Sequence, residues 1–333
     1  MIDLFTDITE IANKDGNKVY DIFFGPNHPG MHGNFGYVVD MIGHSIAKAR
    51  VNAGLLHRGF EKIMETNLWH QNLSLIPRIC VVDPDPNEAA YCGAIEKIMG
   101  LEIPERAKFI RTITLEMSRM TSHLMGMGSV GGATGLYTVM YLMLADRDRL
   151  LDMFEWLTGG RIYHIYNIPG GVRRDLPKGW RDKLYGLMDF FESKLKEYDE
   201  ILYRHPIIHK RLKGVGVITA DQAKKWGITG PNLRATGVKF DTRKAYPYAA
   251  YDQLEFDIPT EKEGDALARA NLVRAEFEVT ISIIRQALDK LPEGDVNIKL
   301  GNPLKFKVPE GEAYAKVESS KGEYGYYIVS TGG

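Results

Sequence analysis

The sequence predicts an α+β fold with an N-terminal β-hairpin region, a large central helical bundle and a short C-terminal β region. Apolar and polar residues alternate over parts of residues 18–55 and 313–330, which is typical of strands. Between these stretches apolar residues recur at spacings of three and four, the period of an amphipathic helix. We expect an N-terminal β region (1–55), a helical core (56–300) and a C-terminal β region (301–333) that form one integrated domain.

The N-terminal region is expected to contain strands at Val19–Phe24, Gly33–Asp40 and Ser45–Val51. Gly43 separates the last two strands and favours a turn between them. The connection Gly25–Gly36 is rich in glycine, proline and histidine. It is too irregular for a regular element, so it is expected to form the loop at a hairpin tip.

The central stretch is expected to contain six helices. The clearest helix carries an apolar stripe, in which Ile113, Met117 and Leu124 fall on one face. Another helix starts after Asp85 and is expected to stop at Gly100, because glycine commonly terminates helices. The expected helices are Arg58–Leu68, Pro86–Met99, Pro104–Met127, Tyr137–Leu157, Lys178–Tyr203 and Glu263–Leu291.

The C-terminal stretch Ala313–Ser330 alternates again and is expected to form a hairpin that turns around Lys321 and Gly322. Two segments, Gly214–Pro259 and Pro292–Pro309, are rich in glycine, proline or tyrosine. These two segments are therefore expected to be irregular.

The bulk composition excludes several classes of protein. The chain has 333 residues, of which 44% are hydrophobic and 26% charged, and its net charge is −1, so no nucleic-acid partner is expected. Its only cysteines, Cys80 and Cys92, provide neither a disulfide framework nor a four-thiolate metal site from this chain alone. No apolar run is long enough for a membrane span, and the polar, acidic N-terminus is not a signal peptide.

Two histidines, His28 and His32, lie four residues apart in the glycine-rich loop. Imidazole groups titrate near neutral pH, so this pair could donate protons or bind a metal ion. A turn in which one histidine acts as a cap is the simpler interpretation of the same spacing.

Two further pairs are candidates for a site. His57 and Arg58 stand at the start of an expected helix and form a locally positive spot that could hold an anion or tune a nearby redox cluster. A solvated helix N-terminus is the alternative for this pair. Cys80 and Asp83 form a Cys-x-x-Asp pair, which is a weak signal because a single buried cysteine usually packs as a small apolar side chain.

Glu116, Arg119 and His123 occupy positions i, i+3 and i+7 of the clearest helix and therefore share one face. This row indicates a polar network inside the bundle, and a purely structural ion pair is the alternative. The sequence contains no Walker loop, GxGxxG, GxSxG or HExxH motif, so it offers no argument for a dinucleotide site or for these hydrolase classes.

Eight sequence blocks, in fixed order from about residue 20 to the end, resemble the large catalytic-core subunit of complex I (the 49-kDa type). The same superfamily includes the large subunits of the group 4 membrane-bound nickel–iron hydrogenases, and the pattern is most similar to membrane-bound sulfane-sulfur reductase large subunits. The blocks are GPNHPGMHG (25–33), GLLHRGFEK (54–62), NEAAYCGAIEKIMGLEIPERA (87–107), SRMTSHL (118–124), PGGVRRDLP (169–177), GVGVITADQAKKWGITGPNLRATGVKFDTRKAYPYAAYD (214–252), IRQALDKLPEG (284–294) and GEYGYYIVS (322–330).

The resemblance implies roles for three residues. His32 matches the loop histidine that contacts the quinone headgroup in complex I. Arg58 matches the arginine that lies against the terminal [4Fe–4S] cluster of the neighbouring small subunit. Cys80 matches the first cysteine of the N-terminal CxxC that ligates nickel and iron in the hydrogenases. The cluster would belong to the small subunit, so no cofactor is expected to be bound by this chain alone.

The chain also departs from the family pattern. Asp83 replaces the second cysteine of the CxxC, and a hard carboxylate is a poor substitute for a soft thiolate. The sequence ends at Gly333, where the family usually continues and where the hydrogenases carry a second CxxC. We therefore expect that this chain supplies no metal ligands. Val81 replaces the tyrosine that donates to the quinone, and Ala133 replaces the carboxylate that partners the loop histidine. Neither side chain can donate a hydrogen bond.

From the resemblance we expect an electron-transfer catalytic-core subunit of a membrane-bound, ion-pumping respiratory complex. Its pocket would lie beside the small subunit's cluster and would reduce polysulfide. His32 would supply protons, Arg58 would raise the cluster potential, and Cys80 or Asp83 would contact the substrate. The alternatives are a quinone- or phenazine-reducing subunit of the NADH dehydrogenase type, then a hydrogenase, then a non-catalytic scaffold.

The resemblance also implies partners. They are a cluster-bearing small subunit, a subunit of the complex I 30-kDa type, and membrane subunits of the quinone-channel and antiporter types. The expected location is the periphery of the cell membrane, on its cytoplasmic side.

Overall fold

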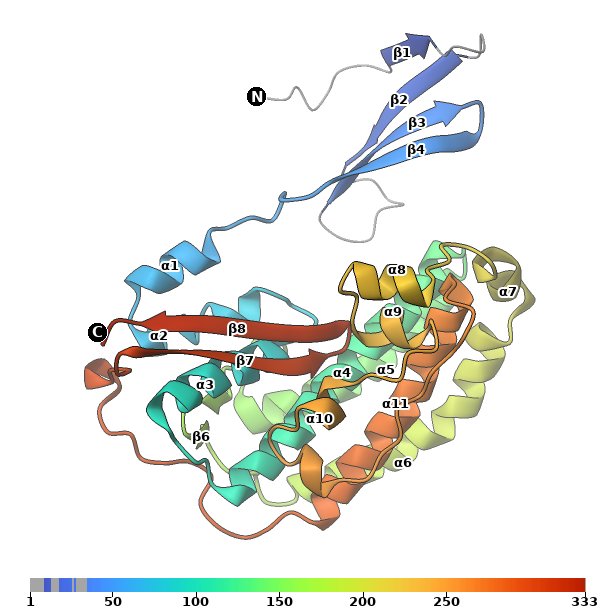
Figure 1. Cartoon of the computed structure of the whole chain (residues 1–333). Helices are drawn as coiled ribbons and strands as arrows, with labels where there is room; N and C mark the ends of the chain where they lie inside the picture. The colour runs from blue at the N-terminus through green and yellow to red at the C-terminus, as the bar shows by residue number, and fades with distance from the viewer. Residues whose placement is uncertain (1–8, 13–17, 26, 28–34, 333) are drawn as a thin grey trace. The chain divides into compact units, whose positions relative to one another are not determined.

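The computed structural model describes residues 9–12, 18–25, 27 and 35–332. The chain divides into two compact units, Met1–Ile63 and Met64–Gly333. The mixed helix and strand content confirms the predicted α+β class, with strands at both ends of the chain and helices between them (Figure 1). Among the described residues, no helix has the length and apolar character needed to cross a membrane.

The first unit contains an antiparallel sheet in the order β1-β2-β3-β4. The three predicted strands are confirmed, and the turn between the last two is held by Gly43, whose φ of 59° lies in the left-handed region. A short strand that the sequence pattern did not indicate pairs with the first of them. Most of the predicted loop Gly25–Gly36 lies outside the described residues. The strands are β1 (Thr9–Ala12), β2 (Lys18–Phe24), β3 (Gly36–Ile42) and β4 (Ser45–Asn52).

Helices make up most of the rest of the chain. All six predicted helices are confirmed. Three short helices, α8 to α10, lie in the segment Gly214–Pro259 that was expected to be irregular, and α2 and α7 lie in connections between predicted helices. The helices are α1 (Phe60–Thr66), α2 (Trp69–Asn72), α3 (Pro84–Met99), α4 (Glu105–Ala133), α5 (Tyr137–Thr158), α6 (Trp180–Tyr198), α7 (Pro206–Leu212), α8 (Ala220–Lys225), α9 (Gly230–Arg234), α10 (Thr242–Ala245) and α11 (Ala266–Asp289).

Two helix boundaries differ from the predicted ones for physical reasons. Helix α3 begins at Pro84, two residues early, because proline lacks the amide hydrogen that the first helical position leaves unpaired. Helix α4 continues past the predicted end at Met127. The apolar stripe of α4 stops at Met127 because Gly128 and Gly131 follow in place of large apolar residues. These glycines allow α4 to pack closely on α5. A Cβ atom at Gly131 would lie 3.0 Å from Val139 Cβ.

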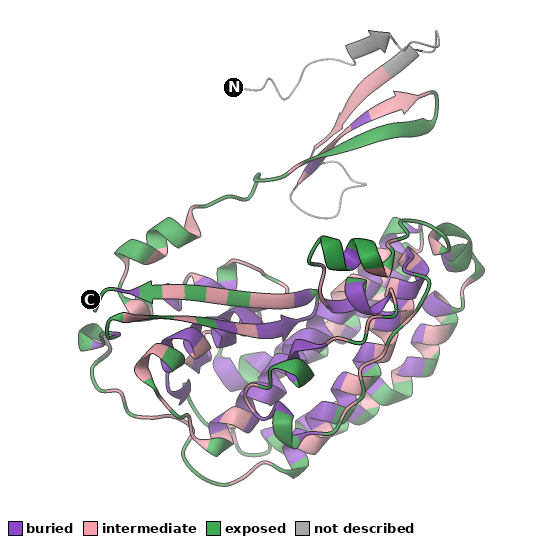
Figure 2. Cartoon of the chain, in the orientation of Figure 1, coloured by how far each residue is buried: buried purple, intermediate pink, exposed green. Residues whose placement is uncertain are grey.

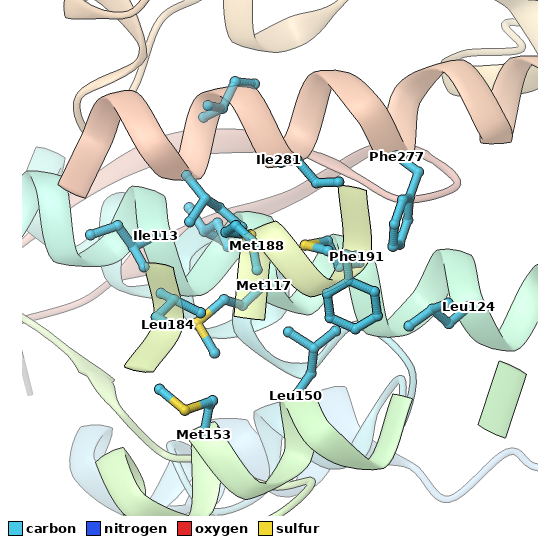
Figure 3. Packing of buried hydrophobic residues seen from close by; sticks show 14 of the residues in the cluster. Ile113, Met117, Leu124, Leu150, Met153, Leu184, Met188, Phe191, Phe277 and Ile281 are labelled. Atoms are coloured by element: carbon cyan, nitrogen blue, oxygen red, sulfur yellow. The ribbon is translucent and has the colours of Figure 1, made fainter. Parts of the chain in front are cut away.

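The main core lies where α4, α5, α6 and α11 pack side by side (Figure 1). Helix α4 is buried along most of its length, whereas α8 is largely exposed (Figure 2). Phe277 of α11 meets Phe191 of α6 edge to face, with ring centroids 5.6 Å apart. Figure 3 shows the core side chains, which include Ile113, Met117, Leu124, Leu150, Met153, Leu184, Met188, Phe191, Phe277 and Ile281.

The predicted C-terminal hairpin is confirmed as β7 (Gly311–Ser319) and β8 (Gly322–Ser330), which pack on α3. Its tip is the two-residue turn Ser320–Lys321. Gly322 has a φ of 133°, and a Cβ atom there would lie 2.6 Å from Thr229 Oγ1. Only glycine fits this close approach, which fixes the tip against the segment before α9.

Candidate functional site

The candidate site begins at the turn between the 3-10 helix Ile76–Arg78 and α3. Cys80 is partly exposed, and the neighbouring Val81 is 46% exposed. The backbone N–H of Asp83 donates to the carbonyl of Cys80 at 3.3 Å. The turn therefore presents a thiol and an apolar side chain at the surface of the second unit.

Asp83, the last residue of this turn, has a buried carboxylate with only 2% of the residue exposed. Its Oδ2 atom accepts hydrogen bonds from Ser319 Oγ at 3.0 Å and Ser320 Oγ at 2.6 Å. Its Oδ1 atom has no hydrogen-bond partner among the described residues. The structure thus brings Cys80 and Asp83 into one turn, leaves Cys80 partly exposed, and ties the carboxylate of Asp83 to the hairpin tip.

The predicted row on α4 lies in a buried network of charges. Glu116 Oε1 accepts hydrogen bonds from Arg119 at 3.3 Å and Arg243 at 3.0 Å. Tyr251 and Thr280 donate to the same carboxylate at 2.6 Å and 2.9 Å. Burial alone would raise the pKa of Glu116, but the two guanidinium groups outweigh burial and lower it. Glu116 is therefore an ionised structural carboxylate.

A second part of the network surrounds Arg234. Its guanidinium contacts the carboxylates of Glu276 at 2.6 Å and Glu318 at 2.8 Å. Burial opposes ionisation of Glu276, yet Arg234 lowers the pKa of that carboxyl to about 2. His123 Nε2 lies 3.4 Å from Glu276 Oε2. Burial lowers the pKa of His123, so its imidazole is neutral near pH 7 despite this neighbour.

This network positions the hairpin tip. Arg119 donates to the carbonyl oxygen atoms of Ser319 at 3.1 Å and Glu318 at 2.5 Å. Because Ser319 and Ser320 in turn hold Asp83, α4 fixes the turn that carries Cys80 through the hairpin. The row on α4, which consists of Glu116, Arg119 and His123, thus supports the candidate site through the hairpin tip.

A further buried cluster follows the turn on α3. Asp85 contacts His164 Nδ1 at 2.9 Å, and Glu88 accepts hydrogen bonds from the backbone N–H groups of Ile165, Tyr166 and Asn167 at 2.7–2.9 Å. Burial, followed by the charge of Asp85, raises the pKa of Glu88 to about 7. No sequence signal pointed to this cluster, because its two halves are more than 70 residues apart.

The other predicted site residues, His28, His32, His57 and Arg58, belong to the first unit. His28 and His32 lie outside the described residues, so their predicted roles stay predictions. His57 and Arg58 lie on the exposed connection before α1, and the Arg58 guanidinium lies 4.5 Å from the centroid of the Phe60 ring. Ala133, at the end of α4, is exposed.

The described cysteines do not fit a nickel–iron centre. Cys92 is fully buried inside α3, where burial raises the pKa of its thiol and disfavours the thiolate that a metal requires. Asp83 presents a carboxylate that two serine hydroxyls already engage. In the part of the chain that the structure describes, no three His, Cys, Asp or Glu side chains gather as a metal site.

The chain resembles known respiratory proteins over most of its length. Residues 133–303 match the family model for the respiratory-chain NADH dehydrogenase 49-kDa subunit. The D subunit of the NADH-quinone oxidoreductase of Thermosipho melanesiensis is 50% identical over 314 residues, which cover 94% of this chain and 86% of the relative. The D subunit of the F420H2 dehydrogenase of Methanosarcina mazei is 39% identical over 316 residues, covering 93% and 84%.

A solved structure gives a close match as well. It is that of the membrane-bound sulfane sulfur reductase, an archaeal respiratory membrane complex. A chain of this complex superimposes with a TM-score of 0.92 at 46% sequence identity. The match covers 96% of the present chain and 87% of the other chain.

Proposed function

Because the chain belongs to the family of the respiratory-chain NADH dehydrogenase 49-kDa subunit, we propose that it forms the substrate pocket of a membrane-bound complex that reduces polysulfide. The chain is an oxidoreductase subunit of the complex I 49-kDa type. The proposal concerns the acceptor and the pocket: electrons arrive from a [4Fe–4S] cluster of the neighbouring small subunit and pass to sulfane sulfur.

The observation that carries this proposal is the surface of the turn before α3. The partly exposed Cys80 and the 46% exposed Val81 present sulfur and hydrocarbon rather than hydrogen-bond donors. A polysulfide chain is soft and polarisable and offers only weak acceptors, so it suits such a surface. A quinone headgroup needs a donor, which Val81 does not supply.

The proposed chemistry places each residue in a role. Cleavage of one S–S bond of the polysulfide takes two electrons, which the cluster would supply one at a time. Both sulfur atoms of the broken bond become anionic, and the one that leaves takes up protons as sulfide. Cys80 contacts the sulfur chain. The buried Asp83 donates protons to the leaving sulfur and holds the turn in place. His32 is the proposed loop donor, and Arg58 with His57 lies beside the cluster and raises its potential.

The same resemblance supports the wider assembly. We propose as partners the cluster-bearing small subunit, a subunit of the complex I 30-kDa type, and membrane subunits of the quinone-channel and antiporter types. The chain would lie on the cytoplasmic side of the membrane. The high structural similarity to a chain of the sulfane sulfur reductase supports both the partners and the acceptor.

Quinone is the second candidate acceptor, and the relatives favour it. The curated relative that is 50% identical is named for quinone reduction. In that case His32 would contact the headgroup, and a donor other than Val81 would complete the pocket.

The test is an acceptor comparison on the purified intact complex. The complex is reduced chemically and then offered polysulfide, a short-chain quinone and protons in parallel. We expect sulfide release, with neither quinol nor hydrogen. Quinol formation without sulfide would replace the proposal by the quinone alternative, and hydrogen evolution would contradict both.

A further inference from the structure

We propose that Lys321, Ser122 and Ser320 form a proton relay that leads from a cavity to Asp83, beside Cys80. The relay rests on the proposed function and deepens it, since it supplies the protons that reduction of the acceptor consumes. Three hydrogen bonds join the hairpin tip, the middle of α4 and the turn before α3.

The relay is continuous at hydrogen-bond distance. Lys321 Nζ lies 3.3 Å from Ser122 Oγ, which lies 2.7 Å from Ser320 Oγ. Ser320 Oγ lies 2.6 Å from Asp83 Oδ2. Ser122 and Ser320 are each 3% exposed and Asp83 is 2% exposed, so the inner part of the path is closed to bulk water.

The hydrogen bonds all point in the same direction. Asp83 Oδ2 accepts from Ser320, so Ser320 uses its one hydroxyl proton to donate to the carboxylate. Ser122 must therefore donate to Ser320, and the ammonium group of Lys321 donates to Ser122. When the leaving sulfur becomes anionic and draws a proton through Asp83, a concerted shift along these three bonds carries one proton from Lys321 to the carboxylate. The neutral amine that remains takes up a proton from the solvent buffer.

The outer end of the relay opens on a cavity of about 270 Å³. Ser122, His123, Ser320 and the exposed Lys321 contribute to its lining. A cavity of this volume has room for several water molecules, and its polar groups can hold them. His123 faces the same cavity, but burial lowers its pKa and its nearest carboxylate is Glu276, so it lies off the path to Asp83.

The inner end of the relay is the Asp83 carboxylate, which has one oxygen left unpartnered by the described part of the chain. Asp83 Oδ1 has no hydrogen-bond partner among the described residues, although the carboxylate is buried. The leaving sulfur takes the proton from Asp83, and a second passage through the relay supplies the second proton of the two-electron step. The electrons come from the [4Fe–4S] cluster of the small subunit in the proposed complex.

Serine variants of the intact complex test the relay. Ser320→Ala and Ser122→Ala each interrupt it, and we expect each to slow turnover about 100-fold, as loss of a positioned proton-transfer group does. Ser122→Thr keeps the hydroxyl and should recover most of the rate. The solvent deuterium isotope effect on turnover should rise in the alanine variants, because proton delivery becomes rate-limiting.

Ser319→Ala is the matched control. Ser319 also donates to Asp83 Oδ2, at 3.0 Å, but it has no place in the path to Lys321. We expect this variant to lose at most about threefold in rate, with an unchanged isotope effect. Equal losses in Ser319→Ala and Ser320→Ala would overturn the relay, since both hydroxyls would then only hold the carboxylate. Unchanged turnover in Ser320→Ala would overturn it as well.

The relay and the proposed acceptor can fail separately. The serine variants are compared with whichever acceptor the wild-type complex reduces. A wild type that reduces only quinone refutes the polysulfide proposal, while the ratio of Ser320→Ala to Ser319→Ala still decides whether the relay operates.

Discussion

Ser320 Oγ donates a 2.6 Å hydrogen bond to Asp83 Oδ2 across 237 residues of sequence. This bond joins the tip of the C-terminal hairpin to the turn that carries Cys80. Because Arg119 of α4 holds the same hairpin by the carbonyls of Glu318 and Ser319, the bundle core, the hairpin and the turn form one connected unit. Substitutions at different points of this connection should therefore have separable effects.

The two cysteines are expected to respond differently to the same substitution. Cys80→Ser removes the sulfur of a partly exposed residue that we propose contacts the substrate. Sulfide release in an assembled complex should therefore fall at least about tenfold, or about 1.4 kcal/mol of transition-state stabilisation. Cys92→Ser places a hydroxyl in a fully buried site and should destabilise the fold by about 1–3 kcal/mol. Turnover at fixed substrate and the yield of assembled complex separate the two effects. Full activity in Cys80→Ser would exclude the thiol from the reaction.

Arg119→Met should lower the thermal stability of the complex, because it loosens the C-terminal hairpin. The substitution leaves Glu116 with one cation fewer and leaves the carbonyls of Glu318 and Ser319 without their donor. Loss of one member of a buried charge pair destabilises a fold by about 3–5 kcal/mol. We expect a marked drop in the temperature at which the purified complex loses half its activity.

Arg285→Met is the control for this variant. Arg285 contacts the exposed carboxylates of Asp189 and Glu192 at the protein surface, where an ion pair contributes at most about 1 kcal/mol. Its half-inactivation temperature should stay close to that of the wild type. Equal losses in both arginine variants would show that burial of the charge network does not matter.

Gly322→Ala should displace the hairpin tip. The new Cβ atom would lie 2.6 Å from Thr229 Oγ1 in a backbone conformation that favours glycine. Hydrogen exchange of β7 and β8 should become faster, and turnover should fall with it, because Ser320 moves away from Asp83. Gly294→Ala carries similar backbone strain at a φ of 139° with open space around the site. The control should leave exchange in the hairpin unchanged.

The free energy of unfolding should fall as the pH rises, because Glu88 loses its proton. Its pKa is raised from 4.5 to about 7, so the folded state holds a proton that the unfolded state releases. The resulting stability is fully present below pH 4.5 and is lost as the pH rises through 7, by about 3 kcal/mol. Hydrogen exchange of α3 in the intact complex, corrected for the intrinsic pH dependence of exchange, measures this slope.

Glu88→Gln should flatten the slope, because its amide does not titrate. The variant should be less stable than the wild type at low pH, since the amide nitrogen faces a backbone N–H at one of the three positions that Glu88 now accepts from. An unchanged slope in this variant would assign the pH dependence to another group, such as His164, whose pKa is raised through its contact with Asp85 although burial opposes the charge.

The helices and the hairpin were predictable because their signals are local. The apolar stripe of Ile113, Met117 and Leu124 marks α4, and the turn at Lys321 and Gly322 marks the hairpin. The end of α4 was missed, since glycines that pack against α5 resemble a stop signal when the partner helix is unknown.

The site was only partly predictable. Cys80 and Asp83 follow from the family resemblance, and Glu116 with Arg119 follows from helical spacing. The hydroxyl groups of Ser122 and Ser320 carried no signal, because serine is common and their contact spans 198 residues. Such pairings depend on how the hairpin docks on α4, which no local pattern encodes.

The proposed reaction requires that electrons leave the small subunit's [4Fe–4S] cluster for sulfane sulfur at the turn before α3. The decisive experiment follows the electron paramagnetic resonance signal of the reduced cluster in the intact complex, frozen at intervals after polysulfide or a short-chain quinone is added. We expect polysulfide to remove the signal within one turnover and quinone to leave it in place. A signal that persists with polysulfide and disappears with quinone would contradict the proposal.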